Sequence, residues 1–339
     1  MQLKTNMQLT FTTLALLLFL SCSNSTEPDP SLDGLFDTPT PTEIAAVKAD
    51  WASRDLSVQN YRVLHSETIL DDRATLKIVA FMVDDHTEYG ALVVPISTEK
   101  MPVRMLINGF QQGLITNSQT INYGPNALDN PFILAIPALR GQSLNLTING
   151  VTYTSPTSDG NHCDAFDGTV NGTLAFVNVI GETEPNTDMD RIGVSGGSRG
   201  GTVALLMAVR NPKIKLVIGM VGPTNMLDLT SNNSTDPTYI CQFLSDLQEG
   251  TVSKEETRLK LIASSPLFFA ENLPATQLHF GADDTIVPKE QGTALQSRME
   301  NLGNIDLLDL HIYEGRNHQN LGVNNSLLQE RVAAFWSNL

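Results

Sequence analysis

Residues 190–202 have the composition of a serine nucleophile site. They read DRIGVSGGSRGGT and contain two overlapping Gly-x-Ser-x-Gly patterns, centred on Ser195 and Ser198. A serine at a sharp turn between a strand and a helix can attack a carbonyl carbon. A helical apolar pattern begins directly after Ser198, whereas a helix starting after Ser195 would have to run through four glycines. We therefore expect Ser198 to be the nucleophile; the alternative, a phosphate-binding turn, lacks a P-loop lysine.

A serine hydroxyl becomes a good nucleophile only when a base takes its proton and an acid orients that base. Three histidines follow Ser198 in the chain, at positions 279, 311 and 318. His279 and His311 lie inside predicted strands. His318 instead lies in the loop that follows the predicted strand Leu308–Tyr313. Because sites in parallel sheets form at the carboxyl ends of strands, we predict His318 as the base and structural roles for the other two.

Apolar periodicity predicts alternating strands and helices around this serine. Short apolar runs are typical of strands buried on both faces. Strands that alternate with helices predict an α/β fold with a mostly parallel sheet, here after an antiparallel lead-in of three strands. The predicted strands are Tyr61–Ile69, Thr75–Val83, Ala91–Ile96, Val103–Ile107, Phe132–Ile136, Arg191–Gly196, Leu216–Val221, Gln277–Phe280 and Leu308–Tyr313; the predicted helices are Asp164–Val179, Thr202–Val209 and a last one with Leu328, Val332, Phe335 and Trp336 on one face.

Two insertions are predicted between these elements. Leu144–Thr154 alternates around Asn149-Gly150, a pattern typical of a type I′ hairpin. The chain shows no strand pattern over about residues 223–272. Since long insertions at strand ends often carry binding residues, we expect this stretch to form a cap over the site.

With these residues in view, the chain resembles the α/β-hydrolases, in particular the group that contains prolyl-oligopeptidase-type catalytic domains, dienelactone-hydrolase-like proteins and acetyl esterases. The resemblance covers roughly Tyr61 to Leu339. It implies an α/β-hydrolase fold with a mostly parallel central sheet, helices on both faces, a cap insertion, and catalytic residues in the chain order serine, acid, histidine. It is carried by Asn108-Gly109-Phe110, Arg140-Gly141, the turn Gly196–Gly201, Ser265-Pro266, Gly281–Asp284 and His318.

The resemblance implies which residue is the acid. In these families the acid lies in a Gly-x-x-Asp-x-x-Val-Pro pattern, which the segment from Gly281 to Pro288 fits with Asp284 in register. We therefore predict Asp284. The neighbouring Asp283 is out of register and is expected to cap a turn, and Asp228 is a weaker alternative.

Attack on a carbonyl builds negative charge on its oxygen, and each backbone N–H aimed at that oxygen lowers the barrier by about 3 kcal/mol. The resemblance implies one such donor at Arg199, directly after the nucleophile, and a second in a loop nearer the N-terminus. We predict the N–H of Phe110 for the second, with Gln111 as the next choice. These families usually have His-Gly before this donor, where the chain has Asn108-Gly109.

Two arginines and one glutamine are candidates for substrate binding. Arg140 and Arg199 could pair with a substrate carboxylate, and Gln111 lies in the predicted oxyanion loop. For Arg140 the alternative is a structural ion pair with Asp164 or Asp167. Arg140-Gly-Gln also resembles the Arg-Gly-Gln of acetyl xylan esterases. Those continue with Ser-Gln-Gly and His-Glu where this chain has Ser-Arg-Gly and His-Gln, so the subfamily stays unassigned.

Composition excludes several classes of protein. The chain has 339 residues, of which 41% are hydrophobic and 17% charged, and its formal net charge is −16. It is too apolar for a disordered protein and long enough for one large core. Because an acidic chain repels phosphate groups, we expect no nucleic-acid partner and no direct binding to anionic lipid. The composition carries no information on the oligomeric state.

The N-terminus predicts an exported protein. Residues 1–21 contain an apolar run, Leu14–Leu20, that suits a signal peptide and is too short to span a bilayer. The run ends near Cys22 in a segment that resembles a bacterial lipobox, which implies lipidation of Cys22 and an anchor in the bacterial cell envelope; an ordinary secretory signal is the alternative. Residues 22–43 are rich in Ser, Thr, Pro and Asp and predict a flexible tether, followed by the hydrolase domain at 44–339.

Two further cysteines, Cys163 and Cys241, remain. In an oxidising compartment they can pair in a disulfide, and the alternative is two buried free thiols. No two cysteines have the spacing of metal ligands, so we expect no metal site.

Together these residues predict a serine hydrolase that cleaves a small-molecule or glycan-linked carboxylic ester through an acyl-enzyme, without a metal or cofactor. A serine peptidase of prolyl-oligopeptidase type is the second hypothesis. Such peptidases usually carry a β-propeller before the catalytic domain, and here only Ile44–Asn60 separates the tether from the resembling region. The third hypothesis is a lipoprotein that uses a disabled hydrolase fold for binding, which predicts a broken set of catalytic residues.

Overall fold

The computed structural model describes residues 32–109, 116–124, 126 and 128–339. The predicted signal peptide, the lipidation site Cys22 and the first part of the predicted tether lie outside these residues, as do Phe110 and Gln111. Among the helices of the described residues, none is long and apolar enough to cross a membrane.

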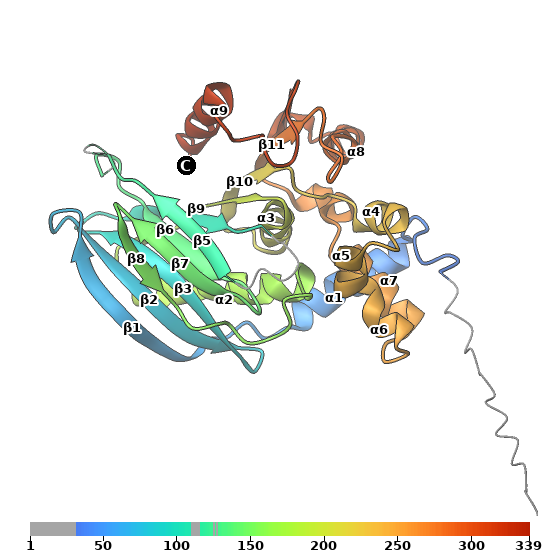
Figure 1. The fold of residues 1–339 in the computed structure, drawn as a ribbon, viewed down its shortest axis with the longest axis horizontal. Coiled ribbons are helices and arrows are strands. Elements are labelled where there is room, and N and C mark those ends of the chain that lie inside the picture. Colours follow the sequence, from blue (N-terminus) through green and yellow to red (C-terminus); the bar gives the residue numbers. More distant parts are fainter. Residues whose placement is uncertain (1–31, 110–115, 125, 127) are drawn as a thin grey trace, which may run out of the picture. The chain divides into compact units, whose positions relative to one another are not determined.

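A nine-stranded sheet forms the centre of the described chain (Figure 1). Strands β1–β3 form the predicted antiparallel lead-in, and β3 also pairs antiparallel with β6. The remaining five interfaces, from β6 to β12, are parallel, as expected for strands that alternate with helices. The order is β1 (Gln59–Ile69), β2 (Ala74–Val83), β3 (His86–Pro95), β6 (Ile133–Ala138), β4 (Met101–Ile107), β9 (Thr187–Gly197), β10 (Ile214–Met220), β11 (Ala275–Gly281), β12 (Leu308–Tyr313).

Helices cover both faces of this sheet, which confirms the predicted fold class. On one face Phe176 of α2 stacks on Phe81 of β2, with ring centroids 5.5 Å apart. On the other face Trp336 of α9 covers Arg104 of β4, whose guanidinium lies 4.9 Å from a ring centroid. The helices of the first face are α2 (Asp167–Thr183), α3 (Arg199–Arg210) and α8 (Glu290–Asn301), and α9 spans Ser326–Trp336.

A smaller sheet of three strands packs against the lead-in strands. Strands β7 (Ser143–Ile148) and β8 (Val151–Thr154) form the predicted hairpin, with positive φ at Asn149 (45°) and Gly150 (87°). Strand β5 (Thr116–Ile121) pairs parallel with β7. It has no strand signal in the sequence because TNSQTI contains one apolar residue.

The stretch between β10 and β11, which the structure describes throughout, forms helices and no strand. We call it the cap. Its helices gather beside α1 (Pro41–Ser53) (Figure 1), and its apolar side chains, among them Leu244 and Leu261, enter the main core. The cap helices are α4 (Met226–Asn232), α5 (Pro237–Tyr239), a π-helical turn (Ile240–Leu244), α6 (Ser245–Gln248), α7 (Lys254–Ala263) and a 3₁₀ segment (Pro266–Asn272).

Residues 32–43, the last part of the predicted tether, belong to the folded domain. Leu35 is fully buried in the main core, and Thr40 forms a capping box with Glu43 at the start of α1. The guanidinium of Arg258, on α7, also binds this segment. Its backbone acceptors are the carbonyl oxygens of Gly34 (3.1 Å), Leu35 (3.0 Å), Asp37 (3.0 Å) and Thr38 (3.4 Å). The prediction of a flexible tether is therefore wrong from residue 32 onward, because these contacts outweigh the polar composition.

Arg258→Ala is expected to lower the free energy of unfolding by about 3 kcal/mol, since it removes several partly buried hydrogen bonds and an ion pair with Glu43 at once. Hydrogen bonding by Arg258 stabilises the charged carboxylate of Glu43 and lowers its pKa to about 2. Urea denaturation followed by circular dichroism measures the change. Arg298→Ala, on the exposed side of α8, is the control; equally small effects of both variants would contradict this role of Arg258.

Candidate active site

Ser198 lies at the predicted turn between β9 and α3. Its backbone has φ 53° and ψ −126°, a left-handed conformation that is costly for a residue with a side chain. The surroundings enforce it: Gly200 lies so close to β4 that a Cβ there would collide with the carbonyl oxygen of Ile107. The glycines of the motif thus let two strands and a helix close around a strained serine.

A chain of hydrogen bonds joins the three predicted catalytic residues. The Ser198 hydroxyl donates to Nε2 of His318 (2.9 Å), and Nδ1–H of His318 donates to Oδ2 of Asp284 (2.9 Å). The Asp284 side chain is fully buried, and its Oδ1 accepts the backbone N–H groups of Ile286 and Val287 at 2.9 Å each. This arrangement can accept the serine proton and stabilise the imidazolium that results.

The loops after β11 and β12 are tied to each other, which fixes the acid against the base. The N–H of Asp283 donates to the carbonyl oxygen of Arg316 (2.9 Å). Gly281 packs against the same carbonyl, with which a Cβ would collide. Asp283 itself is exposed, so the structure brings Asp284 rather than Asp283 to His318.

The other serine, histidines and aspartate that the sequence offers as candidates lie outside this hydrogen-bond chain. Ser195 is buried on β9, where its hydroxyl donates to a backbone carbonyl of β4 (3.4 Å). His279 and His311 lie within β11 and β12, with ring centroids 5.3 Å apart. The carboxylate of Asp228 accepts a hydrogen bond from the amide of Gln291 (3.1 Å).

His279 is buried between two hydrogen-bonding partners that suit its neutral form. The amide N–H of Gln277 donates to Asp309 (2.9 Å), so the amide oxygen of Gln277 accepts Nε2–H of His279 (2.9 Å). Nδ1 of His279 then accepts the hydroxyl of Tyr313 (2.9 Å). Burial, followed by the neighbouring His311, lowers the pKa of His279 to about 3. This is the structural role expected from its place in a strand.

Of the predicted oxyanion donors, Arg199 lies within the described residues. Arg199 is the first residue of α3, so its N–H lies at a helix N-terminus beside the nucleophile. Phe110 and Gln111 lie outside the described residues. The buried guanidinium of Arg199 donates to the carbonyl oxygen of Gly109 (2.8 Å) and to Oε1 of Gln142 (2.9 Å), and burial lowers its pKa to about 9. The Arg199 side chain thus holds the end of the segment that leads into the predicted oxyanion loop.

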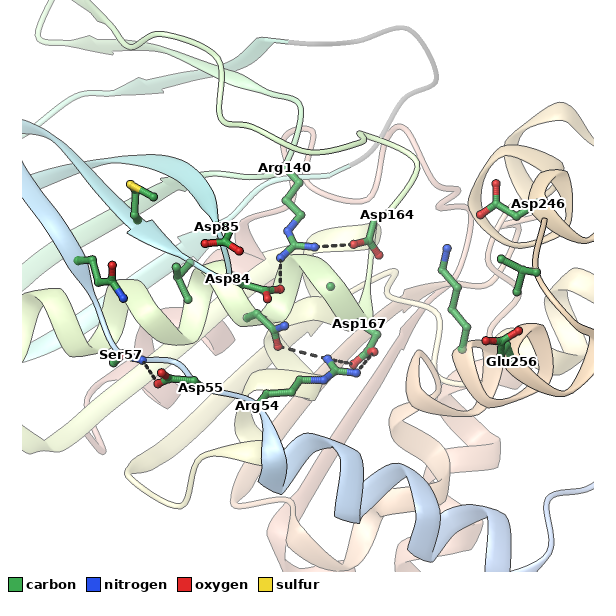
Figure 2. A pocket seen from close by; sticks show the side chains of 17 residues that line it. Arg54, Asp55, Ser57, Asp84, Asp85, Arg140, Asp164, Asp167, Asp246 and Glu256 are labelled. Atoms are coloured by element: carbon green, nitrogen blue, oxygen red, sulfur yellow. Dashed lines mark hydrogen bonds and ion pairs between the residues drawn. The ribbon is translucent and has the colours of Figure 1, made fainter.

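Arg140 lies away from the nucleophile and forms ion pairs (Figure 2). Its guanidinium contacts the carboxylates of Asp164 (2.8 Å) and Asp84 (3.2 Å). Asp167, the other partner considered from the sequence, pairs with Arg54 (2.6 Å). These residues line a separate cavity of about 690 Å³. The structure therefore favours the ion-pair interpretation of Arg140 over substrate binding at the serine.

A cavity of about 810 Å³ opens on Ser198 and His318, a volume typical of sites for small molecules. Its walls come from the hydrolase core and from the cap, as the position of the insertion predicts. The core contributes Phe166, and the cap contributes Tyr239 and Gln242 among others. Burial raises the pKa of Tyr239 to about 12, so its hydroxyl stays protonated and can donate a hydrogen bond.

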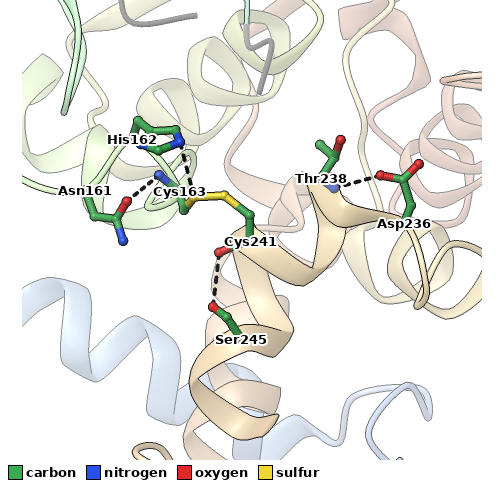
Figure 3. The surroundings of a disulfide bond; sticks show 7 residues. All are labelled: Asn161, His162, Cys163, Asp236, Thr238, Cys241 and Ser245. Carbon is green, nitrogen blue, oxygen red and sulfur yellow. Dashed lines mark hydrogen bonds between the residues drawn. A yellow bond between two sulfur atoms is a disulfide. The ribbon is translucent and has the colours of Figure 1, made fainter. Parts of the chain in front are cut away.

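A disulfide joins Cys163, in the loop before α2, to Cys241 in the cap, with their Cα atoms 5.4 Å apart (Figure 3). Of the two alternatives that the sequence leaves open, the structure has the disulfide. The imidazole of His162 lies within 4.8 Å of both sulfur atoms. A disulfide sulfur is not a thiolate, however, and thiolates are the ligands that metals take from cysteine.

Residues 164–339, more than half of the sequence, match the prolyl oligopeptidase family. The chain belongs to the prolyl oligopeptidase family. The matched segment includes Ser198, Asp284 and His318 in the order serine, acid, histidine. No curated protein matches the sequence.

Solved structures of esterases and peptidases share the fold of this family member. Acetyl xylan esterase 1 from Thermoanaerobacterium sp. has a TM-score of 0.62 at 16% identity, over 91% of this chain and 98% of that one. The acetyl xylan esterase from Paenibacillus sp. has 0.57 at 16%, over 90% and 99%. A puromycin-hydrolyzing peptidase from Mycobacterium tuberculosis has 0.53 at 12%, over 78% of this chain and 46% of that one. These likenesses establish the α/β-hydrolase fold, and with the family they support a serine hydrolase.

Asp284→Asn is expected to lower the kcat of hydrolysis by roughly 10³–10⁴-fold, because an amide holds the His318 imidazole in the wrong tautomer. Asp283→Asn changes the same group one residue away, at an exposed position, and should leave kcat at the wild-type value. Steady-state rates of the two variants decide the assignment, and a larger loss in Asp283→Asn would overturn it.

His279 makes the protein less stable in acid. Its pKa of about 3 in the folded protein lies below the ordinary histidine value of 6.5, so the unfolded chain binds this proton more tightly and stability falls as the pH drops below 6.5. Between pH 7 and pH 5 the wild type should lose about 2 kcal/mol more than His279→Gln. Urea denaturation at both pH values measures the difference; equal losses in the two proteins would show that His279 does not cause it.

Proposed function

We propose that this member of the prolyl oligopeptidase family hydrolyses carboxylic esters. The observation that carries the proposal is the hydrogen-bond chain Ser198–His318–Asp284 on the wall of an 810 Å³ cavity built partly by the cap. A serine, a base and an oriented acid are sufficient for acyl transfer. The chemistry needs no metal ion or cofactor.

The first half of the reaction transfers the acyl group to the serine. Nε2 of His318 takes the Ser198 proton as Oγ attacks the ester carbonyl carbon, and Asp284 stabilises the imidazolium. Negative charge develops on the carbonyl oxygen, where the N–H of Arg199 donates to it. The tetrahedral intermediate then breaks its bond to the alcohol oxygen, which takes the proton from Nε2. The alcohol leaves, and the acyl group remains as an ester on Ser198.

The second half of the reaction repeats these steps with water. Nε2 of His318 takes a proton from a water molecule, whose oxygen attacks the acyl carbon. The new tetrahedral intermediate breaks its bond to Oγ, and His318 returns the proton to Ser198. The carboxylic acid leaves and the free enzyme is restored.

We propose esters rather than peptides as substrates because of how much of each solved structure this chain matches. The two acetyl xylan esterases match over 98% and 99% of their own length, whereas the puromycin-hydrolyzing peptidase matches over 46% of its length. The lead-in strands and the small sheet of this chain therefore belong to an architecture that whole esterases share. A glycan-linked or small-molecule ester is the proposed substrate class, because the cavity combines apolar side chains such as Phe166 with polar ones such as Gln242.

A serine peptidase is the second candidate, and the family itself favours it. The same three residues cleave amides when the departing nitrogen is protonated by the histidine. A third candidate is a binding protein on a disabled hydrolase fold. The unbroken hydrogen-bond chain argues against it, because a binding role alone would not maintain that geometry.

Ser198→Ala is expected to lower kcat/KM for p-nitrophenyl acetate by about 10⁶-fold, because the nucleophile is lost while the base and the acid remain. Ser195→Ala is the matched control, since it removes the other serine of the same motif. Wild-type rates in the control are expected. Equal losses in both variants, or activity that survives in Ser198→Ala, would refute the assigned nucleophile.

The same assay distinguishes the three candidate functions when the wild type is also given a p-nitroanilide of a proline-terminated peptide. Ester hydrolysis with little or no amide hydrolysis supports the proposal. Faster turnover of the amide would favour the peptidase instead. A wild type that cleaves neither ester nor amide would favour the binding protein.

A further inference from the structure

The disulfide lies where the core wall of the serine cavity meets its cap wall. Cys163 is three residues before Phe166, which lines the cavity from the core. Cys241 is in the π-helical turn, between Tyr239 and Gln242, which line it from the cap. We call Tyr239 and Gln242 the cap wall. One covalent bond thus joins the two sides of the cavity across 78 residues of sequence.

The cap wall has no hydrogen bond to the core among the described residues. The hydrogen bonds that Figure 3 shows on the cap side of the disulfide are local: Asp236 accepts the N–H of Thr238 (2.7 Å), and the Ser245 hydroxyl donates to the carbonyl oxygen of Cys241 (3.5 Å). The helical bonds of this segment also stay within the cap. Within the part of the chain that the structure describes, the cap wall is therefore attached to the core by the disulfide and by apolar packing.

Most of the apolar packing of this segment follows Cys241 in the sequence, and Ile240, just before it, also packs against the main core. Phe243 stacks on Phe166 with ring centroids 5.8 Å apart, and Leu244 and Leu247 are buried in the main core. Residues before Cys241 are half-buried or exposed. The disulfide therefore lies between the two residues of the cap wall and is, within the described residues, the one covalent link between this wall and the core side of the cavity, so without it the wall is held by packing alone and moves more easily.

From this arrangement we infer that the Cys163–Cys241 disulfide is a specificity determinant, which holds the cap wall in position for large alcohol groups of the ester. The inference rests on the proposed ester hydrolysis. A substrate that reaches the cap wall has to find it ordered, and if the wall is mobile its ordering lowers the affinity. A small ester that touches the serine and the nearby core is insensitive to the wall. The disulfide acts through the wall and takes no part in the chemistry.

Two acetate esters test this inference, since they share the acyl group and differ in the size of the alcohol. In Cys163→Ser/Cys241→Ser we expect KM for fluorescein diacetate to rise about tenfold, because the cap wall then has to be ordered on binding. The kcat for this ester should change little, and both constants for p-nitrophenyl acetate should keep their wild-type values. Thermal denaturation of the variant fixes an assay temperature at which it is folded.

A double-mutant cycle shows whether the disulfide acts through the wall. Gln242→Ala removes a wall side chain while leaving the disulfide in place, and we expect it to raise KM for fluorescein diacetate as well. The effects of Gln242→Ala and of the cysteine substitutions should not add, because both act on the same wall. Additive effects would overturn the inference. Should the cysteine variants fold poorly, KM for fluorescein diacetate of the wild type before and after reduction with dithiothreitol takes the place of the cycle, and an unchanged KM would overturn the inference.

The outcomes separate this inference from the function on which it rests. A wild type that hydrolyses neither ester counts against the proposed function. A wild type that hydrolyses both, with KM for fluorescein diacetate unchanged in the cysteine variant, leaves that function standing and overturns the role of the disulfide. Hydrolysis of p-nitrophenyl acetate alone would also overturn it, since the wall would then have no large alcohol to hold.

Discussion

The left-handed backbone of Ser198 is the constraint on which the rest of the site depends. A residue with a side chain stays in such a conformation only where its surroundings enforce it. Here β4, β9 and α3 do so by packing at glycines, with Gly200 against the carbonyl of Ile107. The turn lies at the carboxyl ends of the parallel strands, where the loop after β12 delivers His318 within 2.9 Å of the hydroxyl. The strain at one residue is thus held by the close packing of the central sheet.

The catalytic constellation can be predicted from the sequence because each member depends on a local rule. The start of an apolar helix separates Ser198 from Ser195, and a position just after the last strand separates His318 from the histidines inside strands. For the acid, the resemblance supplies the rule, since register within the Gly-x-x-Asp-x-x-Val-Pro pattern of the resembling families separates Asp284 from Asp283. Parallel topology then has to bring the three segments to one edge of the sheet. In the structure they meet there in one hydrogen-bond chain.

Other features depend on contacts between distant segments, which no short pattern reports. Residues 32–43 have the composition of a tether, yet Arg258, which is 224 residues from Gly34, binds them to the cap. Arg140 lies in a motif that suggests substrate binding, but carboxylates from two other segments surround it. The disulfide likewise required knowledge of a Cα separation that only the folded chain defines. The arrangement of the cap helices is the part of the structure that the sequence predicts least, although the cap forms much of the cavity wall.

The central claim is that Ser198 is the nucleophile of a working triad. Mass spectrometry after treatment with a fluorophosphonate tests it most directly, because the reagent leaves a stable adduct on an activated serine. Trypsin releases the peptide Ile192–Arg199, which contains both serines of the motif, and its fragmentation assigns the adduct to one of them. The account predicts a single adduct on Ser198. An adduct on Ser195, or a peptide without any adduct, would contradict it.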